Sequence, residues 1–383
     1  MLQDGVPMCK PSYVTVVAQH RMECLHMRYT LRNLGISTLL FLGLYGFLHD
    51  LRAQNLVYAN SLARTHVQFG VVADEWIDEI QRATNNRVRI RHVPGGSLLR
   101  LENMIEGLRG GVADVGVTNV SSFPGQLPIT ATLAGTADIT LGNRLDTVGL
   151  SLVFMKLLEE FPQITQEFTD VGLVPLVWIP TYTFAVIARD PIATLADFQG
   201  KKIRAFGPNL PRILSAAGAT PLSVAVAEVY TSLQTGVIDA AMTDPPNMVT
   251  GRWYEQAKNV IHTGPGVGAQ TLGIGVAYIF NATSWNRISE ADRATITQIS
   301  RRITLASGKR MQDTGDQALV DLRARGVTTR SLSQSETAEL ARRTGDFAAV
   351  AEARMNELGR PGTAIIARYR QLVEEYVSGR LRP

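Results

Sequence analysis

The residues that could carry out catalysis in this chain are few and far apart. Its 383 residues include two cysteines, Cys9 and Cys24, and both precede residue 54. The later histidines, His66, His92 and His262, fall in separate segments without the spacing of metal ligands. Gly-x-Ser-x-Gly, His-Glu-x-x-His and phosphate-loop lysine motifs are absent from the sequence. The sequence therefore predicts no catalytic residue, no metal site and no cofactor, and leaves recognition of a ligand as the chemistry to look for.

Arg204 is the side chain best suited to such recognition. It lies in 202–206 (KIRAF), a β-branched and aromatic run that predicts a strand. A guanidinium is planar and permanently charged, and it can donate two parallel hydrogen bonds to a carboxylate, whereas a lysine offers only a point charge. An arginine in a strand can equally be an edge residue with its head in water. The residue type alone leaves both interpretations open.

The segment around Arg204 predicts alternating strands and helices. The predicted order is a strand at 202–206, a helix at 211–217, an extended stretch at 221–224, a helix at 227–234 and a strand at 237–242. Short turns with Gly or Pro separate these elements, which is typical of a doubly wound α/β unit. In such sheets ligands bind at the carboxyl ends of the strands, where Arg204, Thr243 and Asp244 fall.

The whole chain predicts two lobes of this kind, because it is too long for a typical single core. Strands at 55–60, 87–93 and 113–118 alternate with helices in the first part, and Pro180-Thr181 and 264–268 predict crossings between the lobes. Helices are expected at 289–310, 335–357 and 361–378, with a late strand at 326–330. The predicted division is residues 1–53 as an upstream segment and signal peptide, 54–180 plus about 269–310 as lobe I, 181–268 as lobe II, and 311–383 as C-terminal helices bracing both lobes.

The N-terminal segment predicts export. Met27 is followed by two arginines and then by 34–48, an apolar and uncharged run that is short for a membrane span. Ala53 ends a cleavage stretch before Gln54, so the pattern is that of a secretory signal peptide whose translation starts at Met27. We therefore expect a periplasmic protein; an uncleaved N-terminal anchor is the alternative. The formal net charge of +4 and the lack of a long basic run predict no nucleic-acid partner.

Three motifs carry a family resemblance. They are 197–204 (DFQGKKIR), 218–221 (GATP) and 228–239 (EVYTSLQTGVID). In order and spacing they resemble the periplasmic solute-binding proteins of TRAP transporters, the dicarboxylate-binding type of extracytoplasmic receptor. The resemblance runs from about Leu56 to the last helices. It implies an α/β, two-lobed fold of the periplasmic-binding-protein type II kind, with discontinuous lobes, hinge crossings and C-terminal bracing helices.

The resemblance also implies a ligand site. Arg204 matches the family's defining arginine, which clamps the ligand carboxylate, and Thr243 and Asp244 stand where the family places a ligand-contacting side chain. Two asparagines that follow strands in the first lobe resemble a binding edge. Phe184 and its neighbour Tyr182 stand near the place of a second arginine found in some members, which argues against doubly anchored ligands. The asparagines of the binding edge are Asn60 and Asn119.

The sequence thus predicts a receptor rather than an enzyme. By hinge closure it would hold a small organic anion and deliver it to the membrane permease subunits of a TRAP-type transporter, as a monomer or a homodimer. Two alternatives remain open at this point. One is an enzyme on the same α/β scaffold, and the other is the ligand-sensing receptor of a signalling system.

Overall fold

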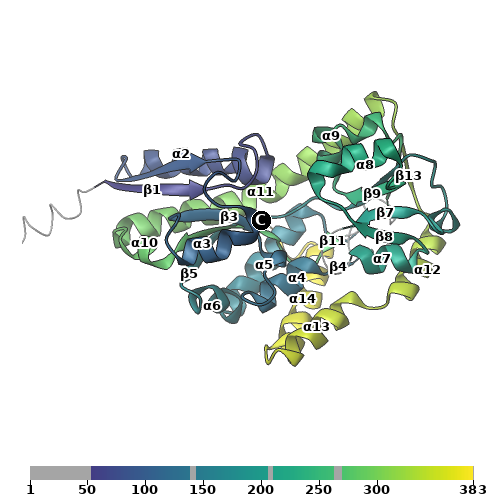
Figure 1. Cartoon of the computed structure of the whole chain (residues 1–383). Helices are drawn as coiled ribbons and strands as arrows, with labels where there is room; N and C mark the ends of the chain where they lie inside the picture. Colours follow the sequence, from purple (N-terminus) through teal and green to yellow (C-terminus); the bar gives the residue numbers. More distant parts are fainter. Residues whose placement is uncertain (1–52, 139–143, 206–209, 263–269, 383) are drawn as a thin grey trace, which may run out of the picture. The chain divides into compact units, whose positions relative to one another are not determined.

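The computed structural model describes residues 53–138, 144–205, 210–262 and 270–382 (Figure 1). The predicted signal peptide, the last residue of the strand predicted at 202–206 and the predicted second crossing at 264–268 lie outside these residues. From Gln54 onward the described residues belong to one compact unit. Within the described ranges, no helix combines the length and apolarity needed to cross a bilayer.

A five-stranded sheet organises the first part of the chain. Its order is β2-β1-β3-β12-β5, with β1 parallel to β2 and β3, and β12 antiparallel to β3 and β5. All six residues of β12 are buried, as expected for a central strand with an apolar sequence. The strands are β1 (Gln54–Ala59), β2 (Val88–Val93), β3 (Val115–Asn119), β5 (Leu173–Ile179) and β12 (Val276–Asn281).

Helices cover this sheet through apolar faces. In α2 the buried residues include Val72, Trp76 and Ile80, which recur at helical spacing and pack against strand residues such as Tyr58 and Tyr278. The other elements of this region are a π-helix (Val67–Val71), two 3₁₀ turns (Leu101–Asn103 and Val120–Ser122), α2 (Val72–Ala83), α3 (Met104–Arg109), α4 (Pro128–Gly135), α5 (Thr147–Glu160), α6 (Gln163–Thr169) and α10 (Ala282–Asn286).

A six-stranded sheet contains Arg204. Its order is β13-β10-β6-β9-β7-β8, with β7 parallel to β8 and β9, and β6 antiparallel to β9 and β10. The strands are β6 (Ala185–Ala188), β7 (Lys202–Ala205), β8 (Thr220–Ser223), β9 (Ala240–Thr243), β10 (Asn259–His262) and β13 (Thr328–Ser331). The accompanying helices are α7 (Leu210–Ala216), α8 (Val229–Thr235) and α9 (Pro245–Thr250), with 3₁₀ turns at Leu195–Phe198, Val226–Glu228 and Trp253–Glu255. A separate pair joins β4 (Ala137–Asp138) and β11 (Gln270–Thr271).

One long helix touches elements of both sheets. Helix α11 (Glu290–Ala324) has 35 residues, so it continues well past residue 310, where the sequence prediction ended it. It contacts α2, α5 and β5 of the first region and α9 of the second. Two glycines let it pack closely without ending it: a Cβ at Gly308 would lie 2.8 Å from the Ser151 hydroxyl oxygen, and one at Gly315 only 2.1 Å from the Tyr182 ring.

The last part of the chain adds one strand and three helices. Strand β13, predicted at 326–330, joins the second sheet in parallel beside β10. The helices are α12 (Gln334–Thr344), α13 (Phe347–Glu357) and α14 (Gly362–Val377). Residues of α12 and Phe347 belong to a core cluster of the second sheet, whereas Met355 of α13 and the buried face of α14 belong to a core cluster of the first. The C-terminal helices therefore pack against both regions.

Candidate functional site

Arg204 lies buried at the carboxyl end of β7. Its side chain is held by main-chain carbonyls just after β8 and within β9: Nε donates to the Val224 carbonyl at 3.1 Å, and Nη1 donates to the Met242 carbonyl at 3.2 Å. The residue is only 4% exposed. Burial lowers the pKa of Arg204 to about 10, against a smaller opposing effect of the nearby Asp244 carboxylate. The guanidinium is therefore still charged at neutral pH and is fixed in orientation.

Thr243 and Asp244 lie beside it at the end of β9. Arg204 and Ala241 are partners in the parallel pairing of β7 and β9, so the two strands end at one edge. Oδ1 of Asp244 accepts a hydrogen bond from the Thr243 hydroxyl at 3.2 Å and another from the Asn247 amide. Burial raises the pKa of Asp244 to about 6, although these hydrogen bonds and the charge of Arg204 act in the opposite direction.

Phe184 and Tyr182 lie in or near the first crossing. Phe184 precedes Ala185, which pairs with Thr243 across β6 and β9, and its buried side chain belongs to the core on the α7 side of the sheet. The Tyr182 hydroxyl donates to Oδ1 of Asp316 in α11 at 2.7 Å, and its ring packs over Gly315. The structure thus places Phe184 at the edge that carries Thr243, and Tyr182 in the core against α11.

Asn60 and Asn119 lie at the carboxyl edge of the other sheet. Asn60 follows β1 and Asn119 ends β3, and these strands are parallel neighbours. Asn60 is 1% exposed, and its Oδ1 accepts from the Leu62 main-chain N–H at 2.8 Å. Oδ1 of Asn119 accepts from both the main-chain N–H and the hydroxyl of Ser121, at 3.1 and 2.7 Å. Apart from Tyr182, the predicted site residues therefore lie at two sheet edges, one in each region.

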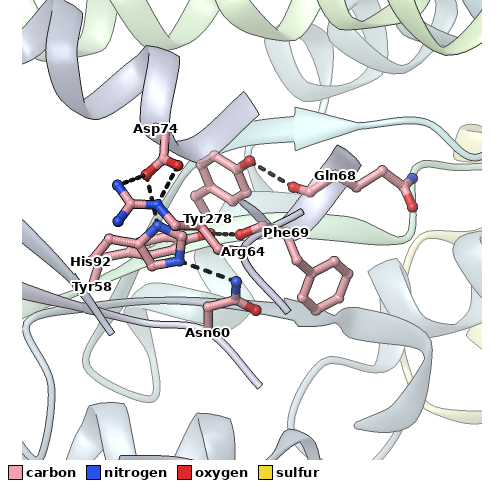
Figure 2. A network of polar contacts seen from close by, with 8 residues as sticks. All are labelled: Tyr58, Asn60, Arg64, Gln68, Phe69, Asp74, His92 and Tyr278. Carbon is pink, nitrogen blue, oxygen red and sulfur yellow. Dashed lines mark hydrogen bonds and ion pairs between the residues drawn. The ribbon is translucent and has the colours of Figure 1, made fainter. Parts of the chain in front are cut away.

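A polar network behind Asn60 was not predicted from the sequence. Nδ2 of Asn60 lies 3.1 Å from Nε2 of His92, and Nδ1 of His92 lies 2.8 Å from Asp74 (Figure 2). Since an amide nitrogen can only donate, Nε2 of His92 accepts, and its Nδ1 carries the proton given to Asp74. Arg64 also donates to Asp74, at 2.7 and 2.9 Å. Burial would raise the pKa of Asp74, but hydrogen bonds from Arg64 and His92 keep it below its usual value.

Hydrogen bonds beside this network reach the first crossing. The Tyr278 hydroxyl donates to the Gln68 carbonyl at 2.6 Å, and the Tyr58 hydroxyl donates to the Phe69 carbonyl at 3.1 Å (Figure 2). The Gln68 amide in turn donates to the Pro180 carbonyl at 2.9 Å. The π-helix that contains Gln68 is therefore bonded both to the first sheet and to the segment where the chain leaves it.

The described residues show no metal centre. No group of three or more His, Cys, Asp or Glu side chains within those ranges is placed to hold a metal ion. The site as described consists of a buried guanidinium, a buried carboxylate, a hydroxyl and two amides. Such groups can orient and hold a charged ligand through hydrogen bonds.

Comparison with known proteins gives both family and fold. The profile of the bacterial extracellular solute-binding proteins, family 7, matches residues 58–348. The chain is 25% identical to a solute-binding protein of Albidiferax ferrireducens over 185 residues, 47% of this chain and 51% of the relative. It is 28% identical to the 2,3-diketo-L-gulonate-binding periplasmic protein of Escherichia coli over 214 residues, 55% and 62% of the two chains. The chain thus spans about half to two thirds of the length of these relatives.

Solved structures extend the fold comparison over most of the chain. A TRAP periplasmic solute-binding protein of Desulfovibrio salexigens matches with a TM-score of 0.73 at 21% identity, covering 84% of this chain and 96% of that one. A Bordetella pertussis extracytoplasmic solute receptor binding pyroglutamic acid matches at 0.68 and 19%, covering 83% and 100%. A Bordetella bronchiseptica TRAP solute-binding protein with bound mandelate matches at 0.71 and 21%, covering 84% and 99%.

These likenesses confirm the predicted fold. The two mixed sheets and their helices form the two-lobed α/β fold of the periplasmic solute-binding proteins. The family profile covers well over half of the chain and describes proteins that bind solutes rather than enzymes. This chain therefore belongs to family 7 of the bacterial extracellular solute-binding proteins.

Proposed function

We propose that this protein is the extracytoplasmic receptor of a TRAP-type transporter, that it binds a small organic anion, and that it delivers this ligand to membrane permease subunits. The observation that carries the proposal is Arg204, a buried and charged guanidinium fixed at the carboxyl edge of a sheet. A desolvated cation in this position favours an anionic ligand, because charge–charge attraction is much stronger away from water.

The proposed site draws on both regions. Arg204 would clamp the ligand carboxylate, with Thr243 and Asp244 beside it and Phe184 as an apolar boundary. Asn60 and Asn119 would approach from the other sheet when the lobes close about the crossing near Pro180-Thr181, and Tyr182 would brace that crossing against α11. Support comes from the solved relatives, whose bound pyroglutamate and mandelate both carry a carboxylate.

The proposed location is the periplasm. The pattern of residues 28–53 supports export through a signal peptide, and the family profile describes extracellular proteins. Mass spectrometry of the protein recovered from a periplasmic fraction should then give a chain that begins at Gln54. A recovered chain that retains residues 34–48 would instead support an uncleaved anchor. Whether the receptor is a monomer or a homodimer stays a prediction.

Matched pairs of ligands test the proposed function. The midpoint of thermal unfolding of the purified protein is measured with a panel of mono- and dicarboxylates, each beside its uncharged carboxamide. A ligand at a hundred times its dissociation constant stabilises the folded protein by about 2.7 kcal/mol. At least one acid should raise the midpoint while its amide does not. If amides and acids shift it equally, or if no acid shifts it, the carboxylate receptor is ruled out.

His92 offers a prediction about how Asn60 is held. Replacing His92 with phenylalanine removes the hydrogen-bond acceptor that faces the Asn60 amide, while a ring of similar size still fills the space. Because one hydrogen bond contributes about 0.5–1.5 kcal/mol, we expect the affinity for the ligand to fall by roughly two- to twelvefold. Calorimetric titration measures the change, and Arg91→Ala, an exposed residue of the same strand, is the control.

A double substitution shows whether His92 acts through Asn60. In an Asn60→Ala background, the His92→Phe substitution should have little further effect on affinity, since the amide it positions is already gone. Full additivity of the two losses would mean that His92 affects binding by another route.

A further inference from the structure

The carboxylate of Asp244 does not serve the helix that it precedes. Asp244 is the N-cap residue of α9, yet its side chain makes no capping hydrogen bond. An N-cap carboxylate ordinarily accepts from the main-chain N–H of the second or third helical residue. Here the first two helical residues are Pro245 and Pro246, which have no N–H to offer. Capping of the helix N-terminus is therefore a weak explanation for an aspartate at this position.

The two oxygens of Asp244 are used unequally. Both of its side-chain hydrogen bonds, from Thr243 and Asn247, go to Oδ1. Among the described residues, Oδ2 accepts no hydrogen bond from another side chain and Asp244 takes part in no ion pair, although the main-chain N–H of Asp244 also donates to its carboxylate. The residue is nevertheless 7% exposed, hence almost fully withdrawn from water. A carboxylate offers about four acceptor positions on its two oxygens, so with both side-chain hydrogen bonds directed at Oδ1, the other oxygen can accept one from a ligand.

Asp244 and Arg204 present opposite charges at one edge. Nη1 of Arg204 donates to the carbonyl of Met242, two residues before Asp244. Each charge acts on the other, and Arg204 is the charged group that acts on Asp244 among the described residues. Burial raises the pKa of Asp244 to about 6, so the carboxylate is still mostly ionised at neutral pH.

This pair of charges selects among carboxylate ligands. A plain carboxylate held by Arg204 would bring its negative charge toward that of Asp244, which costs binding energy. A ligand that also carries a hydrogen-bond donor close to its carboxylate would instead donate to Oδ2. We infer that the receptor prefers acids that bear a hydroxyl or ammonium group close to the carboxylate, and that Asp244 accepts the hydrogen bond of that group. The inference rests on the proposed function, since it requires the carboxylate to be held at Arg204.

Matched acids and one isosteric variant test this. Calorimetry or thermal unfolding compares lactate, alanine and propionate, then mandelate and phenylacetate, then malate and succinate, on the purified wild-type protein and on Asp244→Asn. Of the three sets, the one that the wild type binds most tightly is the one to compare. In that set, the acid with a hydroxyl or ammonium group should bind at least about tenfold tighter than the unsubstituted acid. Comparison of lactate with alanine shows whether the donor is hydroxyl or ammonium. In Asp244→Asn the ratio should fall severalfold, chiefly because the unsubstituted acid binds better.

The matched control is Asp239→Asn. Asp239 lies just before the amino end of the same strand, where its carboxylate accepts from the Lys202 main-chain N–H at 2.8 Å. This variant should keep the wild-type ratio of affinities. A pH series gives a second test: between pH 7.5 and pH 5, unsubstituted acids should bind the wild type more tightly as Asp244 gains a proton, and this gain should vanish in Asp244→Asn.

The outcomes distinguish a failure of the proposed ligand preference from a failure of the proposed carboxylate receptor. If acids bind but the ratio is near one in the wild type, or is unchanged in Asp244→Asn, the preference is overturned while the carboxylate receptor stands. If no acid binds, or if binding persists equally in Arg204→Ala, the carboxylate receptor fails and this inference fails with it.

Discussion

Replacing Arg204 with alanine is expected to weaken binding of the carboxylate ligand by roughly thirtyfold to several thousandfold. The proposed contact is a buried pair of opposite charges joined by hydrogen bonds, and truncating one member of such a pair costs about 2–5 kcal/mol. The variant should still fold, because the contacts that the described residues show for this side chain include hydrogen bonds to main-chain carbonyls rather than apolar core packing. The dissociation constant measured by calorimetry, with circular dichroism to verify folding, checks the prediction.

Two further variants sharpen this result. Arg204→Lys keeps a positive charge but loses the paired donors, and a buried ammonium gives up its proton more readily than a guanidinium, so most of the affinity should still be lost. Lys202→Ala removes an exposed cation from the other end of the same strand and should leave affinity unchanged. Equal losses in Lys202→Ala and Arg204→Ala would mean that net charge, rather than a specific clamp, governs binding.

Gly70→Ala is expected to destabilise the protein by about 3 kcal/mol, among the largest effects of a single methyl group in this chain. A Cβ at Gly70 would lie 1.8 Å from the main-chain oxygen of Arg64, so a backbone segment rather than a flexible side chain would have to move. Inserting a methyl group into such a contact typically costs about 1–3 kcal/mol, and more where the neighbour cannot relax. The midpoint of thermal unfolding should fall by at least about 5 °C.

A second glycine provides the control for this steric argument. A Cβ at Gly125 would meet no atom within 4 Å, so Gly125→Ala should leave the midpoint almost unchanged. A midpoint for Gly70→Ala within 1–2 °C of the wild type, about the shift expected from less than 1 kcal/mol, would show that the segment around Arg64 relaxes freely. In that case the network around Asp74 would be less rigid than the contacts indicate.

Local pattern was enough to predict the edge that carries Arg204. The strands β7 and β9 and the helices between them follow one another in the sequence with short turns, so Arg204, Thr243 and Asp244 could be assigned to strand ends without knowing the rest of the fold. The antiparallel place of β6 beside β9 could not be predicted in this way, because pairing across a crossing depends on the packing of the whole sheet.

His92 and Gln68 show what local pattern cannot reach. In the sequence, His92 continues an alternation of apolar and basic residues and lacks the spacing of a metal ligand, so local pattern predicts no partner for it. In the structure, the side chain of His92 is only 3% exposed, and its Nδ1 is hydrogen-bonded to Asp74, a residue of α2. Gln68 bonds to a carbonyl 112 residues away, at Pro180. The hydrogen bonds of His92 and Gln68 depend on how the helices pack on the sheet. The spacing of residues within a single segment contains no information about that packing.

The extent of α11 was underestimated for a related reason. Glycine is a poor helix former, and Gly315, beyond the predicted end at residue 310, lowers the local preference for a helix. The structure shows that Gly308 and Gly315 instead permit close contacts, with Ser151 and with the Tyr182 ring. Tertiary packing therefore outweighs local preference along this helix.

The continuity of α11 has a mechanical consequence. A single 35-residue helix contacts elements of both sheets, and at Gly315 and Asp316 it is also packed and hydrogen-bonded to the first crossing. The two sheets therefore cannot rotate about the crossing as freely jointed bodies. Long helices deform by gentle curvature spread over many turns, so a change in the angle between the sheets must bend this helix elastically. Part of the free energy of ligand binding would then be held as curvature in α11 and would favour reopening on release.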